Sequence, residues 1–348
     1  MSEVKEDAGY DARTLIQDLQ PNELSREYCA LYHTFGLDTS KRNNLAYIEQ
    51  DVCLYIAGNA LVVMQLSTMK KKYIMGLGGR GVGAFCVHPD KTHVAVGAKE
   101  NDPKIYIYNY PSFTLAKVLE KGTERGYSCL QFDPQGGASL ASVGMAPDYL
   151  LTIWDWQAER IVLHNKAFGQ DVFNVQFSPR REGFLNTSGT GHIRFWKMAS
   201  TFTGLKLQGD IGKFGKIDLS DVGAFWELPD GKVLSGTEAG YLLLWEGNFI
   251  KLRLTRAGGG PAHAGPVNVV KFQEDTQQFV TGGADGVLRF WGLAAVDRAE
   301  VDADVSLDYE LEPDREVRVA PGADIFCAER APDGGSYLVL DAAGALRR

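Results

Sequence analysis

The chain of 348 residues is 45% hydrophobic and 23% charged, which is ordinary for a globular protein. Its formal net charge of −8 argues against bulk binding of nucleic acid or anionic membranes, since both need a positive surface. The sequence has no apolar run long enough to cross a membrane, and its acidic start, MSEVKEDAGYDARTL, lacks the apolar core of a signal peptide.

Residues 1–27 are predicted to form a flexible acidic segment. From about residue 45 onward, a unit of about 45 residues recurs. Each unit has an apolar run, a turn, a second apolar run that ends mostly at glycine, and a third run that ends in an aromatic residue. The turn residues of successive units lie 45, 45, 50, 45 and 58 positions apart: Pro89, Pro134, Pro179, Pro229, Glu274 and Pro332.

Three alternating apolar runs between short turns predict antiparallel strands, and the variable linker after each unit can supply a fourth. The period is typical of a WD-repeat β-propeller, so we expect an all-β fold of about seven four-stranded blades over residues 28–348. The repeats lie near residues 45–66, 81–110, 127–156, 171–198, 222–247, 262–293 and 324–348. The aromatic residues that end the third runs are Tyr108, Trp154, Trp196, Trp245 and Trp291.

The first and last units depart from the pattern. Met64 stands where the first unit should have its aromatic residue. The seventh unit stops before its third run is complete, so we expect the last blade to be cut off and the chain to be the N-terminal piece of a longer protein. One hypothesis is that EYCALYHTF (27–35) supplies a strand to the seventh blade, because an open ring exposes strand edges. Deleting residues 1–36 is then expected to lower the melting temperature.

The glycine-rich stretch GLGGRGVG (76–83) matches the G-x-G-x-x-G pattern of dinucleotide-binding turns. Such a turn must open a helix, but Pro89 and strand-like alternation follow instead, so the glycines favour a tight turn between blades. The histidines form no cluster at metal-ligand spacing, and the five cysteines form no C-x-x-C pair. We therefore expect no cofactor, no metal and no enzymatic activity, and a reduced intracellular compartment. An enzyme that uses the glycine turn is the alternative, which dinucleotide titration would test.

The sixth unit contains AHAGPVNVVKF, which resembles the Gly-His region of WD repeats. That resemblance implies a structural hydrogen-bonded tetrad of His263, Thr281, Asp285 and Trp291 that joins three strands. The other units have residues such as Thr123 or Phe168 near the histidine position, so they should depend more on apolar packing.

Three surface features are possible partner contacts. The first is the basic group of Lys70, Lys71, Lys72 and Arg80. The second is TFTGLKLQGDIGKFGK (201–216), with Lys213 and Lys216, which either packs between blades or projects as a contact loop. The third is the acidic linker, residues 294–323, which is interpreted as an outer blade strand with a solvated acidic face or as an acidic docking edge. Its candidate contact residues are Asp302, Asp304, Asp308, Glu310 and Glu312.

Several segments, among them LTIWDW, KAFGQDVFNVQFSP and ELPDGKVLSGTEAGYLLLWEGNFIK, resemble the N-terminal WD-repeat region of the cilia- and flagella-associated protein 44 family. The resemblance runs from about Tyr32 to Trp291 and implies a non-catalytic axonemal scaffold. It implies a place in the tether and tether-head complex that links inner-arm dynein f (I1) motor heads to the doublet microtubule. Its partners would be dynein heavy chains, a related axonemal WD-repeat protein and tubulin. The alternative is a general intracellular WD-repeat scaffold or microtubule-binding module that is not specific to cilia.

Overall fold

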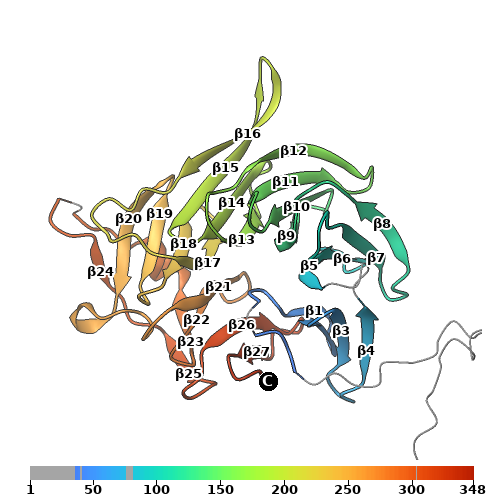
Figure 1. The fold of residues 1–348 in the computed structure, drawn as a ribbon. Helices are drawn as coiled ribbons and strands as arrows, with labels where there is room; N and C mark the ends of the chain where they lie inside the picture. The colour runs from blue at the N-terminus through green and yellow to red at the C-terminus, as the bar shows by residue number, and fades with distance from the viewer. Residues whose placement is uncertain (1–35, 40, 76–80, 303) are drawn as a thin grey trace, which may run out of the picture. The chain divides into compact units, whose positions relative to one another are not determined.

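The computed structural model describes residues 36–39, 41–75, 81–302 and 304–348, and these residues form almost entirely β-strands. The strands build seven sheets that are arranged as the blades of a ring (Figure 1). The prediction of an all-β propeller with about seven blades is therefore confirmed. None of the helices in the described part is long and apolar enough to span a membrane.

The first three blades each have four strands in chain order. Blade one contains β1 (Ala46–Glu49), β2 (Val52–Ala57), β3 (Ala60–Gln65) and β4 (Lys71–Met75). Blade two contains β5 (Val82–Val87), β6 (His93–Ala98), β7 (Ile105–Asn109) and β8 (Leu115–Leu119). Blade three contains β9 (Tyr127–Phe132), β10 (Ser139–Gly144), β11 (Leu150–Asp155) and β12 (Arg160–Lys166).

The remaining blades differ in strand number. Blade four contains β13 (Val172–Phe177), β14 (Phe184–Gly189), β15 (His192–Thr201) and β16 (Gly204–Ile211). Blade five contains β17 (Val222–Glu227), β18 (Val233–Thr237), β19 (Leu242–Glu246), β20 (Phe249–Thr255) and β24 (Asp308–Glu310). Blade six contains β21 (Val267–Gln273), β22 (Gln278–Gly283), β23 (Val287–Gly292) and β25 (Arg315–Arg318). Blade seven contains β26 (Ile325–Arg330), β27 (Tyr337–Asp341) and β28 (Leu346–Arg347); a short 3-10 helix (Ala257–Gly259) and α2 (Leu293–Asp297) lie in the connections.

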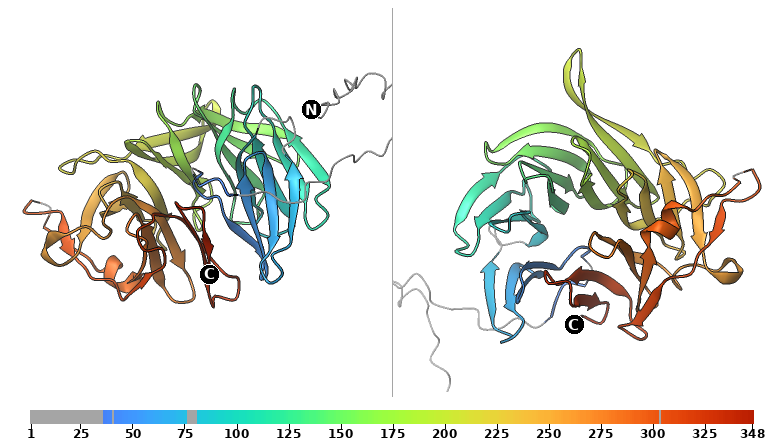
Figure 2. Two further views of the ribbon diagram at one scale, coloured as in Figure 1. Left: turned by 60° about the horizontal axis from the view of Figure 1, so that its bottom comes forward. Right: turned by 180° about the vertical axis from the view of Figure 1, so that it is seen from behind.

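The first strands of all seven blades contact one another in sequence, and β26 contacts β1, so the ring is closed (Figure 2). Hydrophobic clusters fill the space between neighbouring blades. One of them joins Leu54 and Ile56 of blade one to Phe85 of blade two. The close approach needs glycine at position 83, because a Cβ atom there would lie 2.2 Å from the carbonyl oxygen of Tyr127 in the next blade.

The acidic linker supplies two strands rather than one continuous outer strand. The alternation over residues 301–311 suggested a single strand, but only Asp308–Glu310 is extended there, as β24. It pairs parallel to β20 and adds a fifth strand to blade five, whereas β25 is the outer strand of blade six. The linker thus leaves β23 of blade six, pairs with the edge of blade five through β24 and returns to blade six as β25 before the chain enters blade seven.

Blade seven is joined to blade one by an apolar cluster that includes Tyr47, Cys53 and Leu340. The backbone amide of Asp333 also donates a hydrogen bond to Oε1 of Gln50, at 2.9 Å. The sequence hypothesis expects EYCALYHTF to add a strand to blade seven, but these residues, 27–35, lie outside the described part of the chain. That hypothesis stays a prediction.

Candidate functional site

The histidine, threonine, aspartate and tryptophan of blade six lie together as a chain of hydrogen bonds. The indole of Trp291 donates to the hydroxyl oxygen of Thr281 at 2.9 Å, and the same oxygen lies 2.8 Å from Nε2 of His263. Nδ1 of His263 lies 2.9 Å from Oδ1 of Asp285. A proton on Nδ1 satisfies all three contacts, because the imidazole then donates to Asp285 and accepts the hydroxyl proton of Thr281.

A fifth residue, Arg289, completes this group, and the sequence reasoning missed it. Its Nη1 donates to Oδ2 of Asp285 at 2.6 Å, and its Nε donates to Glu316 at 2.9 Å. Burial raises the pKa of Asp285, but the hydrogen bond from His263 and the charge of Arg289 outweigh it and hold this pKa well below its usual range. Burial lowers the pKa of His263. The group is thus a structural clamp with a neutral imidazole.

The tryptophans at the ends of the third strands are buried, and each indole finds a hydroxyl on the neighbouring second strand. Trp154 donates to Ser142, Trp196 to Thr187 and Trp245 to Ser235, at 2.8, 2.9 and 2.8 Å. Tyr108 is also buried, at 6% exposure, at the matching place in blade two. These bonds join the second and third strands of blades three, four and five, as the bond from Trp291 to Thr281 does in blade six. No histidine takes part in them.

A short segment before β1, residues 38–44, lies across one end of the ring and contacts several blades. Lys41 donates to the carbonyl oxygen of Gly83 in blade two, at 3.3 Å. Arg42 donates to Asn268 of blade six at 3.0 Å and stacks over the ring of Phe173 in blade four, at 4.5 Å. Asn43 donates to Asn174 of blade four at 2.5 Å. We name residues 38–44 the plug segment.

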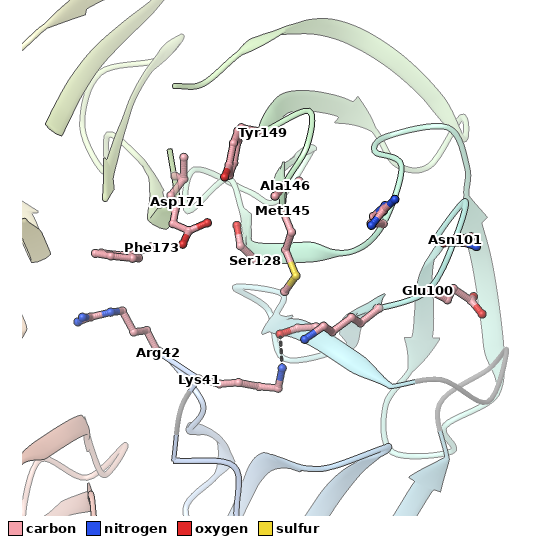
Figure 3. Close-up of a pocket in the computed structure, with 15 residues that line it drawn as sticks. Lys41, Arg42, Glu100, Asn101, Ser128, Met145, Ala146, Tyr149, Asp171 and Phe173 are labelled. Atoms are coloured by element: carbon pink, nitrogen blue, oxygen red, sulfur yellow. Dashed lines mark hydrogen bonds between the residues drawn. The ribbon is translucent and has the colours of Figure 1, made fainter. Parts of the chain in front are cut away.

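Beside the plug segment lies a cavity of about 730 Å³. Its walls come from the β6–β7 loop of blade two, the β10–β11 loop of blade three and the start of β13 in blade four. Figure 3 shows Lys41 extending along one side of it, whereas the guanidinium of Arg42 points away. The lining residues include Lys41, Lys99, Glu100, Arg125, Ser128, Met145, Tyr149, Asp171 and Phe173. The cavity therefore combines apolar walls with several charged groups.

Lys41 is a largely enclosed cation of this cavity, with only 14% of its side chain exposed. Burial lowers its pKa; the carboxylate of Asp38 at 3.6 Å opposes this, and the nearby ammonium of Lys99 adds to it. Two like charges thus lie close together at the cavity wall. This arrangement could not be predicted from the sequence, since Lys41 lies in the plug segment, Lys99 lies in blade two and neither stands in a recognisable motif.

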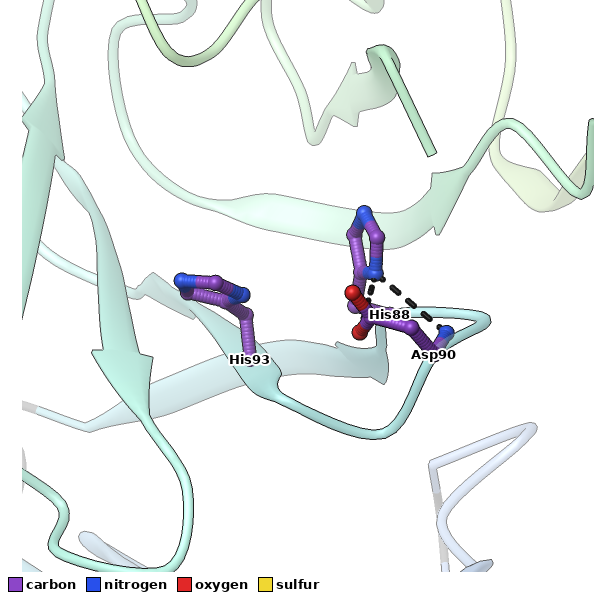
Figure 4. A group of neighbouring side chains, drawn as sticks. All are labelled: His88, Asp90 and His93. Atoms are coloured by element: carbon purple, nitrogen blue, oxygen red, sulfur yellow. Dashed lines mark hydrogen bonds and ion pairs between the residues drawn. The ribbon is translucent and has the colours of Figure 1, made fainter. Parts of the chain in front are cut away.

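His88, Asp90 and His93 form a cluster on the turn between β5 and β6 (Figure 4). Their ligand atoms lie within 4.8 Å of one another, which makes the group a formal metal candidate. Both nitrogens of His88 are already engaged, however, with Asp90 at 2.6 Å and the carbonyl oxygen of Gly137 at 3.2 Å. Oδ1 of Asp90 also accepts bonds from the amide and hydroxyl of Thr92. A metal would have to break these bonds, so the cluster is better explained as a turn that the side chains stabilise.

The basic residues of the first predicted contact group lie on and beside β4. Lys71 and Lys72 lie over the rings of Tyr55 and Phe113, at 6.0 and 5.1 Å. Lys70 is exposed, and Arg80 lies outside the described residues. Lys71 and Lys72 thus make cation–π contacts within the chain, and the described residues of this group do not line a common cavity.

The second predicted feature, residues 201–216, has two parts. Strands β15 and β16 form a long hairpin that projects from blade four (Figure 1), with Phe202 fully exposed at its tip. Beyond the hairpin, Phe214 is buried against Trp245, with ring centroids 5.3 Å apart. Lys213 lies over Phe249 at 4.7 Å, and Lys216 follows in an exposed turn. One part of the stretch therefore packs between blades and another part projects, and contact of the projecting part with a partner stays a prediction.

The acidic linker uses much of its charge inside the molecule. Asp308 forms a bidentate pair with Arg253, at 2.6 and 2.9 Å, and Glu312 pairs with Arg256 at 2.8 Å. Asp302, Asp304 and Glu310 are exposed, and none of them forms an ion pair within the described residues. This linker therefore fastens blades five and six, and only part of its charge remains for a partner.

A family model described as the echinoderm microtubule-associated protein first beta-propeller matches residues 80–318, which is more than half of the chain. The chain belongs to this β-propeller family. Curated proteins named cilia- and flagella-associated protein 44 are 51% identical over 90% of the chain in Chlamydomonas reinhardtii and 44% identical over 92% in Mus musculus. The resemblance found in the sequence is thereby confirmed.

A human protein of the same propeller family, echinoderm microtubule-associated protein-like 4, is 25% identical over 89% of the chain. The chain spans 18% and 17% of the length of the two relatives named cilia- and flagella-associated protein 44, and 31% of the human protein. Most of each relative therefore lies outside the region that this propeller matches.

Proposed function

We propose that the chain is a non-catalytic structural propeller of the ciliary or flagellar axoneme. Within it, the propeller would belong to the tether and tether-head complex that links inner-arm dynein f (I1) heads to the doublet microtubule and regulates beating. The observation that carries the proposal is the 51% identity, over 90% of the chain, to a protein whose name associates it with cilia and flagella.

The geometry supports a binding role rather than a catalytic one. Burial raises the pKa of the thiols of Cys53, Cys129 and Cys327 to about 12, so they are poor nucleophiles. Both nitrogens of the buried His263 are engaged by Asp285 and Thr281 in the blade-six clamp. A closed ring with a projecting hairpin is instead a rigid body with several separate surfaces, which suits a scaffold that holds partners in fixed positions.

A general microtubule-binding module is the second candidate, and the echinoderm microtubule-associated protein match favours it. The two can be separated in ciliated cells that lack the endogenous protein and are rescued with a tagged full-length copy. The axonemal proposal expects the tag to remain in detergent-extracted axonemes and the dynein f heads to lose their fixed position in unrescued cells. Binding to cytoplasmic microtubules, with none of the tag in axonemes, would support the second candidate instead.

A further inference from the structure

Positively charged side chains line the cavity beside the plug segment, and few of them form an ion pair with a carboxylate of the described chain. Lys99 and Arg125 line it, both are exposed, and neither forms an ion pair within the described part of the chain. Lys41, the third cation, has a single carboxylate neighbour at 3.6 Å, which is a long contact for an ion pair. The chain as a whole carries a net charge of −8, so this gathering of cations is local.

Elsewhere on the surface, several arginines form close ion pairs with carboxylates. Arg253, Arg256 and Arg330 each have a carboxylate within 3.0 Å. Lys41 and Lys99 instead line the same cavity, and the charge of Lys99 is one cause of the lowered pKa of Lys41. An anion between them would replace this repulsion by two charge-assisted contacts, which are among the stronger hydrogen bonds in proteins.

The shape and the remaining walls narrow the class of anion. A volume of about 730 Å³ lies in the range of ligand sites and far exceeds that of a single inorganic anion. Met145, Tyr149 and Phe173 offer apolar and aromatic contacts, which a peptide side chain can use. Figure 3 shows the carboxylates of Glu100 and Asp171 at the cavity as well; these can accept hydrogen bonds from the amides of a peptide, whereas a polyphosphate has no such donors.

We propose that this cavity binds an acidic peptide segment of a partner protein, with its carboxylates between Lys41, Lys99 and Arg125. The plug segment fixes the site, because Arg42 and Asn43 anchor it to Asn268 and Asn174 in the opposite blades. Lys41 is thereby held at the cavity wall before any partner arrives, which lowers the ordering cost of binding. The inference concerns this propeller alone and does not depend on its place in the axoneme.

The test is fluorescence anisotropy of the purified chain with a labelled hexaglutamate peptide. The main variant is Lys99→Glu, because Lys99 is exposed and its replacement should leave the fold intact. Lys206→Glu is the matched control: it makes the same change of charge at an exposed lysine of the projecting hairpin. Melting temperatures of both variants show whether each is folded.

The expected result is saturable binding that Lys99→Glu weakens about tenfold or more, since a charge-assisted contact is replaced by repulsion. Arg125→Glu should act in the same direction, and Lys206→Glu should bind as the unaltered chain does. No binding by the unaltered chain, or equal weakening by Lys99→Glu and Lys206→Glu, would overturn the proposal. Competition by inorganic phosphate at the same concentration as the peptide would also overturn it, because the site would then take any small anion.

Discussion

The hydroxyl oxygen of Thr281 lies 2.9 Å from the indole nitrogen of Trp291, and both side chains are buried in blade six. Thr187 and Trp196 repeat this contact in blade four, also at 2.9 Å. The difference is that Thr281 also meets His263, whereas Nε2 of the blade-four histidine, His192, has no hydrogen-bond partner. Blade six thus combines the threonine–tryptophan bond with a histidine contact, whereas blade four has the threonine–tryptophan bond alone.

Replacing Thr281 by valine should cost more stability than replacing Thr187 by valine. Both changes remove the acceptor of a buried indole, but Thr281→Val also leaves Nε2 of His263 without a partner. We expect a free energy of unfolding about 1–3 kcal/mol lower for Thr281→Val than for Thr187→Val. Urea unfolding of the two variants measures it. Equal losses would show that the histidine link adds nothing.

Acid should weaken the fold through His263. Burial lowers its pKa in the folded chain below about 6.5, the ordinary value, so at lower pH the unfolded chain binds a proton that the folded chain refuses. The stability it contributes is therefore present above about pH 6.5 and is lost as the pH falls toward the folded pKa. Burial lowers the pKa of His192 in the same direction. Asp285 acts at lower pH, since its lowered pKa makes its contribution fade only below about pH 4.

The measurement compares unfolding free energies at about pH 7.5 and about pH 5. His263→Gln should start less stable but lose less between the two pH values, by up to about 2 kcal/mol. His164→Gln, on an exposed part of β12, is the matched control for the substitution itself. An unchanged pH dependence in His263→Gln would contradict the assignment of a neutral imidazole.

The plug segment should contribute strongly to the stability of the ring through Asn44. Its buried amide donates to the carbonyl oxygens of Asp38 and Ile56, and its oxygen accepts the amide of Ile56 at 2.6 Å. Asn44→Ala removes the acceptor of the buried Ile56 amide and one donor from each carbonyl oxygen, although that of Ile56 still accepts from the amide of Asp38, so we expect a loss of about 2–4 kcal/mol. Asn109→Ala, which removes a partly exposed asparagine that bonds the side chains of Thr114 and His93, should cost less than Asn44→Ala in the same urea titration.

Phe202 at the tip of the projecting hairpin should matter for assembly but not for folding. Its side chain is fully exposed, so Phe202→Asp should change the melting temperature little. If the hairpin contacts an axonemal partner, the variant should be retained less in detergent-extracted axonemes than the unaltered protein. Val305→Asp, at another exposed apolar residue, is the control. Equal retention of both variants would remove the hairpin from the list of contact surfaces.

The repeat made most of the fold predictable, because every blade restates the same alternation, turn and aromatic end. Trp154 and Trp245 could be placed at strand ends from spacing alone, since one side of each strand must be buried. The strands with which the acidic linker pairs could not be predicted in this way. Alternation over residues 301–311 shows which side chains share a face, but pairing with β20 depends on Arg253 of blade five, which meets Asp308 only in space.

The candidate site could not be predicted from the sequence either, because its residues come together only in the folded structure. Its cations come from the plug segment and two different blades, and no local pattern links Lys41 to Lys99 or Arg125. The plug segment itself has no alternation and no repeat. The sequence therefore does not indicate that Arg42 contacts Asn268 of blade six. Ring closure brings such residues together, and spacing along the chain does not encode it.

The central claim, that this propeller holds partners in the axoneme, is tested most directly by cross-linking mass spectrometry of intact axonemes that contain the full-length protein. Lys70 and Lys72 at β4 and Lys206 and Lys213 at the hairpin are exposed and provide reactive amines on separate surfaces. The account predicts cross-links from these lysines to dynein f heavy chains, tubulin or a second WD-repeat protein. Recovery of the protein in axonemes with cross-links to none of them, or its absence from axonemes altogether, would contradict it.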